Sequence, residues 1–222
     1  MKFQSLYDSI WCSCDKERSD QYQALQSGGY INAGKEVAVI RLNKTFGQYL
    51  TTGASKTQRY WKWHSQGIAV SNQLTVKAID PVDHVVAIHE INTSMPVRSG
   101  GPMRENYLKS PTQLKVEFLD IQHTGCPFHT SAFYGCFDEN DLLIGYLRLV
   151  RIGTLLLYAR FLAHGDHLHK GPMFKMHCHA YCVAFDHVPD GLIMYGAWNS
   201  GGEGLQFWKK RCGFEPQTLE EE

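Results

Sequence analysis

The feature that most constrains the fold is a run of apolar, β-branched and aromatic segments in the second half of the chain. From about residue 114, four such segments follow one another: LKVEFLDI (114–121), TSAFYGCF (130–137), DLLIGYLRLV (141–150) and GTLLLYARFL (153–162). The turn-forming stretches DEND and RIG separate the last three. Short turns place successive strands side by side in opposite directions, so we predict an antiparallel meander.

The chain after this meander changes to alternating helices and strands. Gly171 and Pro172 are typical of a helix start, and we expect that helix to continue through Phe185. GLIMYGAW (191–198) has the composition of a buried strand, and GEGLQFWKKRC (202–212) that of a short helix. GFEP then leads into a last short strand, so the predicted order is three strands, a helix, a strand and a helix.

The first 110 residues mix helices and strands less regularly. We predict helix up to about Gly29, where paired glycines stop it, and a strand over KEVAVIRL (35–42). One or two helices should follow over residues 45–67, with Ser55 as an N-cap, and an extended stretch over residues 68–79.

A further helix is predicted to start at Asp80 and Pro81, because Val85, Ile88 and Ile91 repeat at helical spacing. The segment 94–111 is rich in breakers and reads as a loop with one helical turn. A long loop in a compact domain is often functional.

The composition indicates a compact soluble protein. Of the 222 residues 43% are hydrophobic, and the formal net charge is zero, so no global field attracts nucleic acid or an anionic membrane. No apolar run approaches the roughly 20 residues needed to span a bilayer. The first twenty residues lack an apolar stretch followed by a small-residue cleavage site. We therefore expect a cytoplasmic protein without a membrane partner, whose seven scattered cysteines are reduced.

The order of these elements, with three local signatures, resembles the GNAT acyltransferase superfamily. The signatures are YGCFDENDLLIGYLRLVRIG (134–153), the strand, loop and helix of LLLYARFLAHGDHLHKGPMFKMHCHAY (155–181), and MYGAWNSGGEGLQFWKKRCGFEP (194–216). The resemblance covers residues 114–216 well and the N-terminal half loosely. It implies an α+β fold with a mixed, mostly antiparallel central sheet flanked by helices and an N-terminal α/β extension. We expect an acyltransferase core over residues 111–222, with residues 1–110 as a degenerate half or a cap on the acceptor side.

One departure from the pattern points to a branch of the superfamily. Most GNAT enzymes carry a Tyr four residues before the terminal Gly-Phe, and here that position is Lys209. The ending FWKKRCGF looks more like the FemAB and cellulose-biosynthesis-type branch, and the basic helix at residues 55–70 is similar to one in that branch. Some members of the branch use aminoacyl-tRNA, so this donor, and with it a tRNA partner, stays an alternative to acyl-CoA.

The segment HGDHLHKGPMFKMHCHAYC (164–182) has two readings. In the superfamily the acyl-CoA pyrophosphate lies on the free amides where a loop becomes a helix, a place where the helix dipole also favours an anion. Gly171, Met173 and Phe174 would supply these amides and Lys170 a charge. The other reading is a zinc site of Cys178 and Cys182 with a histidine from the loop, but the familiar short ligand spacings are missing. We expect no metal.

The resemblance implies N-acyl transfer by direct attack of an amine on an acyl-CoA-type donor in a ternary complex. The donor would lie between splayed strands, with a backbone amide near Leu162 or Ala163 polarising its carbonyl. The amine acceptor would be a small molecule or a peptide. An aminoacyl transferase or a non-catalytic binding module with this fold remains an alternative. The candidate catalytic residues are His164, Tyr158 and Glu117. The candidate donor-binding residues are Leu162, Ala163, Lys170, Gly171, Met173, Phe174, Asn199 and Lys209, and the candidate acceptor-binding residues are Arg98, Arg104 and Tyr134.

Overall fold

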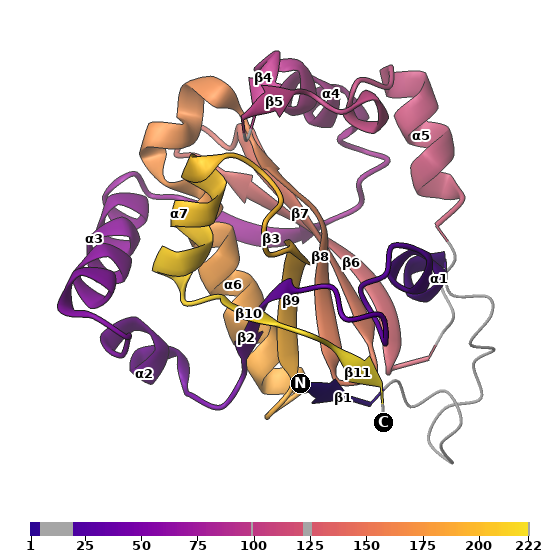
Figure 1. Cartoon of the computed structure of the whole chain (residues 1–222). Helices are drawn as coiled ribbons and strands as arrows, with labels where there is room; N and C mark the ends of the chain where they lie inside the picture. Colours follow the sequence, from indigo (N-terminus) through magenta and orange to yellow (C-terminus); the bar gives the residue numbers. More distant parts are fainter. Residues whose placement is uncertain (5–19, 99, 122–125, 222) are drawn as a thin grey trace.

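A seven-stranded mixed sheet runs through the computed structural model, which describes residues 1–4, 20–98, 100–121 and 126–221 (Figure 1). Its strands lie in the order β10-β2-β9-β8-β7-β6-β3, and all neighbours are antiparallel except β8 and β9, which are parallel. The strands are β2 (Val37–Arg41), β3 (Thr75–Ile79), β6 (His129–Phe137), β7 (Leu143–Ile152), β8 (Leu155–Ala163), β9 (Leu192–Ala197) and β10 (Glu215–Gln217).

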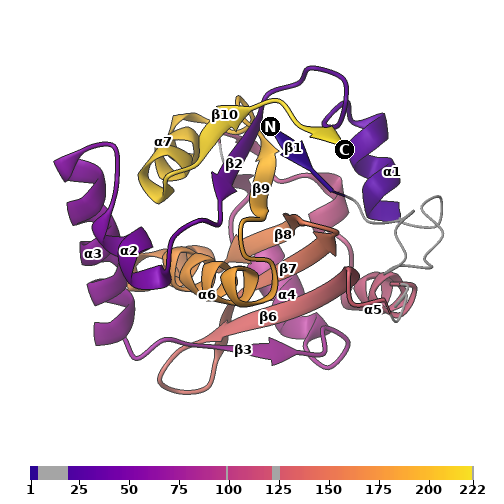
Figure 2. The same cartoon turned by 90° about the horizontal axis from the view of Figure 1, so that it is seen from below.

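Helices cover both faces of this sheet (Figures 1 and 2). The helices are α1 (Asp20–Ser27), α2 (Phe46–Thr51), α3 (Lys56–Ser71), α4 (Val85–Thr93), α5 (Pro111–Leu119), α6 (Pro172–His187) and α7 (Glu203–Cys212), with 3-10 turns η2 (Glu105–Tyr107) and η3 (Gly165–Lys170). Side chains of α2, α3, α6 and α7 share one core cluster with the sheet, whereas α4 and α5 form another with the opposite face. Two small pairs complete the described strands: β1 (Lys2–Phe3) with β11 (Glu220–Glu221), and β4 (Val97–Arg98) with β5 (Gly101–Pro102).

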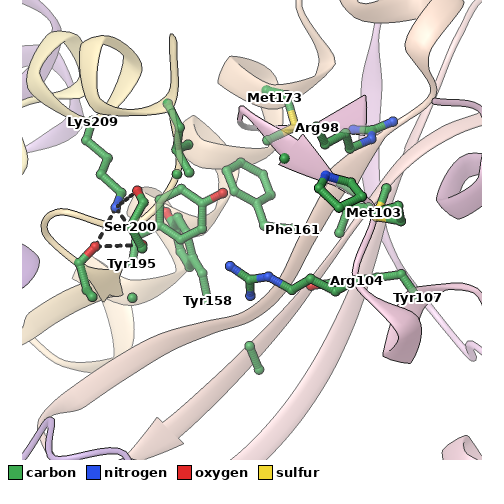
Figure 3. A pocket seen from close by; sticks show the side chains of 18 of the residues that line it. Arg98, Met103, Arg104, Tyr107, Tyr158, Phe161, Met173, Tyr195, Ser200 and Lys209 are labelled. Atoms are coloured by element: carbon green, nitrogen blue, oxygen red, sulfur yellow. Dashed lines mark hydrogen bonds between the residues drawn. The ribbon is translucent and has the colours of Figure 1, made fainter. Parts of the chain in front are cut away.

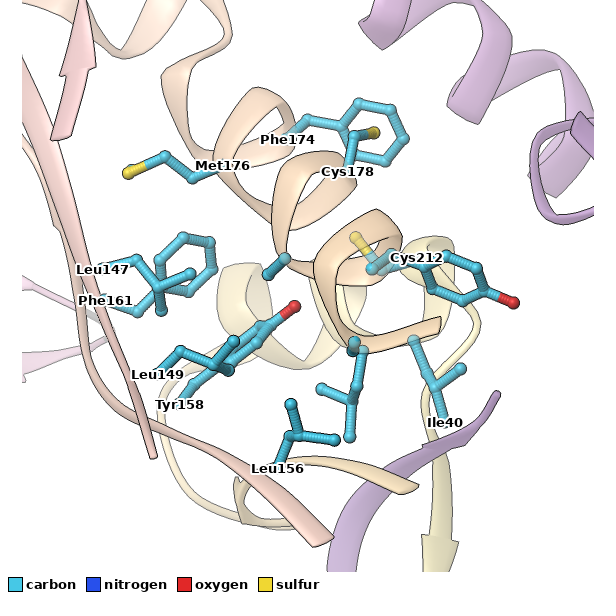
Figure 4. Close-up of a cluster of buried hydrophobic side chains, with 14 of the residues drawn as sticks. Ile40, Leu147, Leu149, Leu156, Tyr158, Phe161, Phe174, Met176, Cys178 and Cys212 are labelled. Carbon is cyan, nitrogen blue, oxygen red and sulfur yellow. The ribbon is translucent and has the colours of Figure 1, made fainter. Parts of the chain in front are cut away.

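The core under α6 contains side chains from the meander strands β6 to β8, from β2 and β9 on one side of them and from β3 on the other. Figure 4 shows Met176 of α6 pointing toward the strands that carry Leu147 and Leu149, whereas Cys178 lies on the other side of the helix beside Phe174. Burying these side chains removes their apolar surface from water, at roughly 25 cal/mol per Å². The predicted helix at Gly171–Phe185 and the following strand and helix are confirmed within about two residues.

The predicted meander is confirmed for its three central strands and wrong for the first segment. Residues 111–119 form α5, and Glu117 therefore lies on a helix. Leu114, Val116 and Phe118 alternate as in a strand, but Ser110 and Gln113 form a capping box and Pro111 occupies the first turn. The local hydrogen bonds of this cap favour helix, and Val116 is left exposed.

Two N-terminal predictions also need correction. The extended stretch begins at Thr75, because α3 continues to Ser71 beyond its confirmed cap at Ser55. The helix predicted from Asp80 begins at Val85, since Asp80 uses its carboxylate to bind the amide of Val82 in a preceding turn. Of the helix expected before Gly29 only α1 can be judged, because residues 5–19 lie outside the described residues.

The predicted fold class is confirmed: the chain is α+β, with a mostly antiparallel sheet between helices. Residues before 111 contribute β2 and β3, and both pair within the same sheet as the strands that follow. The segments before and after residue 110 therefore both contribute strands to one sheet.

Gly145 of β7 tests how tightly α6 packs on the sheet. A Cβ there would meet the Met176 side chain at 2.8 Å and the Leu162 carbonyl oxygen at 3.1 Å. We expect Gly145→Val to lower the free energy of unfolding, measured with urea, by about 3 kcal/mol, because the backbone oxygen cannot move aside. Gly47→Ala is the control, since nothing lies within 4 Å of its Cβ, and it should raise stability by less than about 1 kcal/mol. Equal effects would contradict tight packing at Gly145.

Candidate active site

The strands β8 and β9 separate near their carboxyl ends and leave a cavity between them. They pair only over Leu155–Leu157 and Leu192–Met194, although β8 continues to Ala163 and β9 to Ala197. The cavity has a volume of about 400 Å³. Its described lining residues are Tyr30, Arg98, Gly101, Pro102, Met103, Arg104, Tyr107, Tyr158, Ala159, Phe161, Leu162, Met173, Tyr195, Gly196, Ala197, Ser200, Gly201, Leu205 and Lys209.

This lining contains side chains from both faces of the sheet. Tyr158 and Phe161 belong to the cluster under α6, whereas Leu162 belongs to the cluster under α4 and α5. The cavity therefore lies at the gap between the strands, in contact with side chains from both faces of the sheet.

Lys209 brings a buried positive charge to one wall of the cavity. Only 1% of its surface is exposed, and its ammonium donates to the carbonyls of Ala197 at 2.6 Å, Trp198 at 3.3 Å and Ser200 at 3.2 Å (Figure 3). Burial, and then the nearby Arg104, lower the pKa of Lys209 to about 8. These bonds hold the loop between β9 and α7 in shape around the cavity.

Two arginines supply positive charge from the opposite wall. Arg98 donates to the Ala163 carbonyl and, at 3.1 Å, to the Ser94 hydroxyl, and burial lowers its pKa. The Arg104 guanidinium makes no hydrogen bond or ion pair with any part of the chain that the structure describes, and Figure 3 shows it reaching into the cavity. None of the described lining residues is Asp, Glu or His. The cavity is therefore suited to an anionic ligand.

A tight contact between two loops closes the cavity on one side. Gly100, in the turn between β4 and β5, has a φ of +83°, and a Cβ there would lie 2.9 Å from Cα of Gly202. Only glycine fits such a position without displacing the neighbouring backbone. The contact ties the hairpin that carries Arg98 to the loop that Lys209 holds.

Two hydrogen-bond donors at the edge of the cavity have no partner among the described residues. The Tyr195 hydroxyl makes no hydrogen bond to the described residues, and burial raises its pKa, which keeps it protonated. The amide of His164 donates to Ile144 on β7. Because successive amides of a strand point to opposite sides, the amide of Ala163 points into the gap. The sequence offered little reason to place Tyr195 in a functional site, since a tyrosine in an apolar strand is normally part of the hydrophobic core.

Three solved structures show how far the fold of this chain resembles that of known proteins. FemX superposes with a TM-score of 0.61 at 11% identity, over 90% of this chain and 66% of its own. L-PGS from Bacillus licheniformis superposes with a TM-score of 0.51 at 9% identity, over 82% of this chain and 57% of its own. The PaiA N-acetyltransferase from Thermoplasma acidophilum, in complex with coenzyme A, gives 0.47 at 16% identity, over 62% of this chain and 87% of its own.

The fold is GNAT-like, and the solved structure of FemX is similar to it. This confirms the resemblance drawn from the motifs. The chain spans less than two thirds of FemX and L-PGS, and the low identity shows the fold alone. A scan of protein-family models and a search of curated proteins found no match to the sequence.

The structure brings six of the residues chosen from the sequence together in the cavity, and Ala163 borders it. The six are Arg98, Arg104, Tyr158, Leu162, Met173 and Lys209. Lining residues that the sequence did not single out include Tyr195, Ser200, Tyr107 and Phe161. Tyr107 and Phe161 had no signal that separates them from ordinary core or loop residues.

The other candidate catalytic residues lie outside the cavity lining. The His164 imidazole caps η3, where Nδ1 accepts the Asp166 amide at 3.3 Å. Glu117 accepts hydrogen bonds from Arg160 and, at 2.9 Å, from Lys109. Both side chains are thus occupied by local structure.

The turn that enters α6 is partly engaged as well. Lys170 donates to Asp138 at 2.9 Å and to Glu139 at 3.4 Å. A Cβ on Gly171 would contact Ile68 of α3 at 3.5 Å, so α3 flanks this turn. Three further candidates lie elsewhere: Phe174 is in the core against Trp61, Tyr134 packs on the His179 ring, and Asn199 is exposed.

No group of three or more His, Cys, Asp or Glu side chains that could hold a metal ion occurs among the described residues. Cys178 is buried in the core, where desolvation raises the pKa of its thiol. In the described part of the chain no helix is long and apolar enough to cross a bilayer.

A buried chain of hydrogen bonds supports Tyr158 beneath the cavity. His177, fully buried on α6, contacts the Tyr158 hydroxyl through Nδ1 at 2.8 Å and the Tyr49 hydroxyl through Nε2 at 2.7 Å. Tyr49 donates its only hydroxyl proton to the Cys212 carbonyl at 2.8 Å. His177 must therefore donate from Nε2, and in a neutral imidazole Nδ1 then accepts from the Tyr158 hydroxyl. Burial, and then Lys62, lower the pKa of His177 to about 3.

This network predicts a loss of stability in acid. The pKa of His177 is near 6.5 in the unfolded chain and lower in the folded protein, so the unfolded state takes up a proton first as the pH falls below about 6.5. Between pH 6.5 and pH 5 this should remove about 2 kcal/mol from the free energy of unfolding. His177→Asn should flatten the pH dependence in urea titrations, whereas His64→Asn, on the exposed face of α3, should keep the wild-type slope. The same slope in all three proteins would refute a neutral buried His177.

Proposed function

We propose that the protein is an N-acyltransferase that moves an acyl group from an activated, anionic donor of the acyl-CoA type to an amine. The observation that carries the proposal is the cationic cavity between β8 and β9, whose lining includes side chains from both faces of the sheet and no carboxylate among the described residues. The GNAT-like fold supports acyl transfer, and the charge of the cavity supports a donor that carries phosphate.

The donor carbonyl would lie against the inner edge of β8. The Ala163 amide faces this gap, and a fixed amide aimed at a developing oxyanion stabilises acyl transfer without reorganisation. Arg98 holds the carbonyl of the same residue, which fixes the orientation of the peptide. The guanidinium of Arg104, which has no partner in the described part of the chain, is placed to bind the anionic portion of the donor.

The chemical step then needs a proton carrier near the leaving group. The amine nitrogen forms a bond to the acyl carbon, and the bond from that carbon to the leaving sulfur or oxygen breaks. Tyr195 would give its proton to the leaving atom and recover one from the attacking amine, so that protons balance over the turnover. Burial raises the pKa of Tyr195, so the hydroxyl carries its proton before attack.

The donor is tested first by binding. The full chain is titrated with acetyl-CoA and longer acyl-CoAs and, separately, with aminoacyl-tRNA, and thermal stability and the mass of added amines are followed. Stabilisation and acyl transfer with an acyl-CoA are expected. Transfer from aminoacyl-tRNA alone would assign the FemAB-like alternative. Binding of a donor without transfer to any amine would leave a binding module.

Arg104→Gln should weaken the binding of the productive acyl-CoA by about tenfold or more, because it removes a charge-assisted contact. Since Arg104 is exposed and its side chain makes no hydrogen bond to the described residues, the variant should fold normally. Lys115→Gln removes one positive charge from the exposed face of α5 and is the matched control. Equal weakening by both variants would show that only the general charge of the surface matters.

Tyr195→Phe should lower kcat by about 100-fold with little change in KM, because it removes the proton carrier and keeps the ring. Tyr60→Phe, which removes an exposed hydroxyl from α3, should leave both constants unchanged. A wild-type kcat in Tyr195→Phe would exclude this tyrosine from the chemistry.

A further inference from the structure

A second cavity lies on the far side of α7, away from the gap between β8 and β9. Its volume is about 750 Å³. The described residues lining it come from β2, β10 and the segments around α2, α3 and α7, which lie near one another in Figure 2. They are Met1, Val39, Ile40, Arg41, Asn43, Lys44, Tyr49, Thr52, Gly53, Ala54, Gln58, Lys62, Tyr181, Trp198, Lys210, Gly213, Phe214, Glu215, Pro216 and Gln217. Tyr158, Arg104 and Lys209 belong to the first cavity alone.

A buried lysine lies at the floor of this cavity. Only 3% of Lys62 is exposed, and its ammonium makes one hydrogen bond, to the backbone carbonyl of Tyr49, while lying 4.1 Å from the centre of the Tyr49 ring. An ammonium has three protons to donate, so two remain without a partner among the described residues. A buried charge with this little compensation is costly unless a ligand supplies the rest.

Three more cations surround the cavity without carboxylate partners. Arg41, Lys44 and Lys210 are exposed, and none of them forms an ion pair with a described carboxylate. Glu215 is the one acidic residue among the described lining residues. Four positive charges therefore face one negative charge across a single cavity.

The wall of the cavity also offers flat and polar surface. Trp198 is partly buried there, and the Lys210 ammonium lies 6.0 Å from the centre of its ring. An aromatic ring next to several cations is a common setting for nucleotide bases and their phosphates.

We propose that this cavity is a second binding site, for a small ligand that carries a phosphate group, in which Lys62 binds the phosphate from the buried side. Arg41, Lys44 and Lys210 surround the same group from the rim, and Trp198 accommodates an attached ring. The site does not depend on the proposed acyl transfer, because its residues are distinct from those of the first cavity.

The test measures the binding of two phosphate probes to the full chain by calorimetry, at constant ionic strength set with chloride. Inorganic pyrophosphate carries the phosphate chemistry alone, and adenosine 5′-monophosphate adds a ring. We expect binding of at least one probe, and tighter binding of the nucleotide would assign the site to nucleotides. No binding of either probe would overturn the proposal and would leave the acyltransferase proposal untouched, since neither probe carries an acyl group.

Lys62→Met should weaken binding of the tighter probe by about tenfold or more, because it removes a charge-assisted contact. Met has a similar length and no charge to desolvate, so the variant should fold. Lys56→Met removes a charge from the exposed start of the same helix and should bind as the wild type does. Equal weakening by Lys56→Met would show non-specific attraction and refute the site.

Lys44→Gln provides a second test of the site if Lys62→Met fails to fold. Lys44 is exposed, so its loss leaves the core intact, and the variant should weaken probe binding several-fold while Lys56→Met does not. Wild-type affinity in Lys44→Gln and Lys62→Met together would place any bound probe elsewhere on the protein.

Discussion

The structure depends on the point at which β8 and β9 stop pairing. β8 follows β7 along its whole length, whereas β9 turns toward β2, where the pairing is irregular next to Val39 and Gly196 has a φ of +60°. Each strand thus loses one neighbour over its last residues, and the carbonyls on the inner edges need other donors. Arg98 binds the carbonyl of Ala163, and Lys209 binds that of Ala197. The split in the sheet therefore explains both the cavity and the cations that line it.

Buried lysines occur on both sides of α7, and neither has a carboxylate partner among the described residues. Burial lowers the pKa of Lys62 and of Lys209 to about 8 in each case, which shows that the surroundings disfavour the charged forms. Desolvating an ammonium without a counterion reduces stability. The two lysines differ in how far backbone oxygens compensate them: Lys209 meets three carbonyls, whereas Lys62 meets one. Lys209 is consequently well placed to hold a loop, and Lys62 is better placed to receive a ligand.

The sequence predicted the parts of the fold that local chemistry decides. The turns at Asp138–Asp141 and Gly153 carry residues suited to a positive φ, and the strands between them are long and apolar, so the meander was readable. The prediction of a strand at residues 114–121 was wrong. The alternation of apolar and polar residues there fits a strand, but the helix cap at Ser110 and Pro111, just before this segment, favours a helix.

The site was harder to read from the sequence, because it depends on where strands separate. The histidine-rich stretch drew attention through its composition, yet His177 acts as a buried support and His164 as a cap. No sequence pattern around Tyr195 distinguished it from an ordinary core tyrosine. Its exposure to the cavity follows from the parting of β8 and β9, which is a property of the whole sheet.

The short helix α7 links the two cavities by its own geometry. Lys209 and Lys210 are consecutive, and successive residues of a helix point about 100° apart, so one lysine lines each cavity. The end of α7 is fixed by Gly213, which has a φ of +90° and leads directly into the pairing of β10 with β2. Its start is fixed by the contact of Gly202 with Gly100. With both ends held, the ten residues of α7 cannot reposition one lysine without moving the other, so any substitution that shifts this helix alters both cavities.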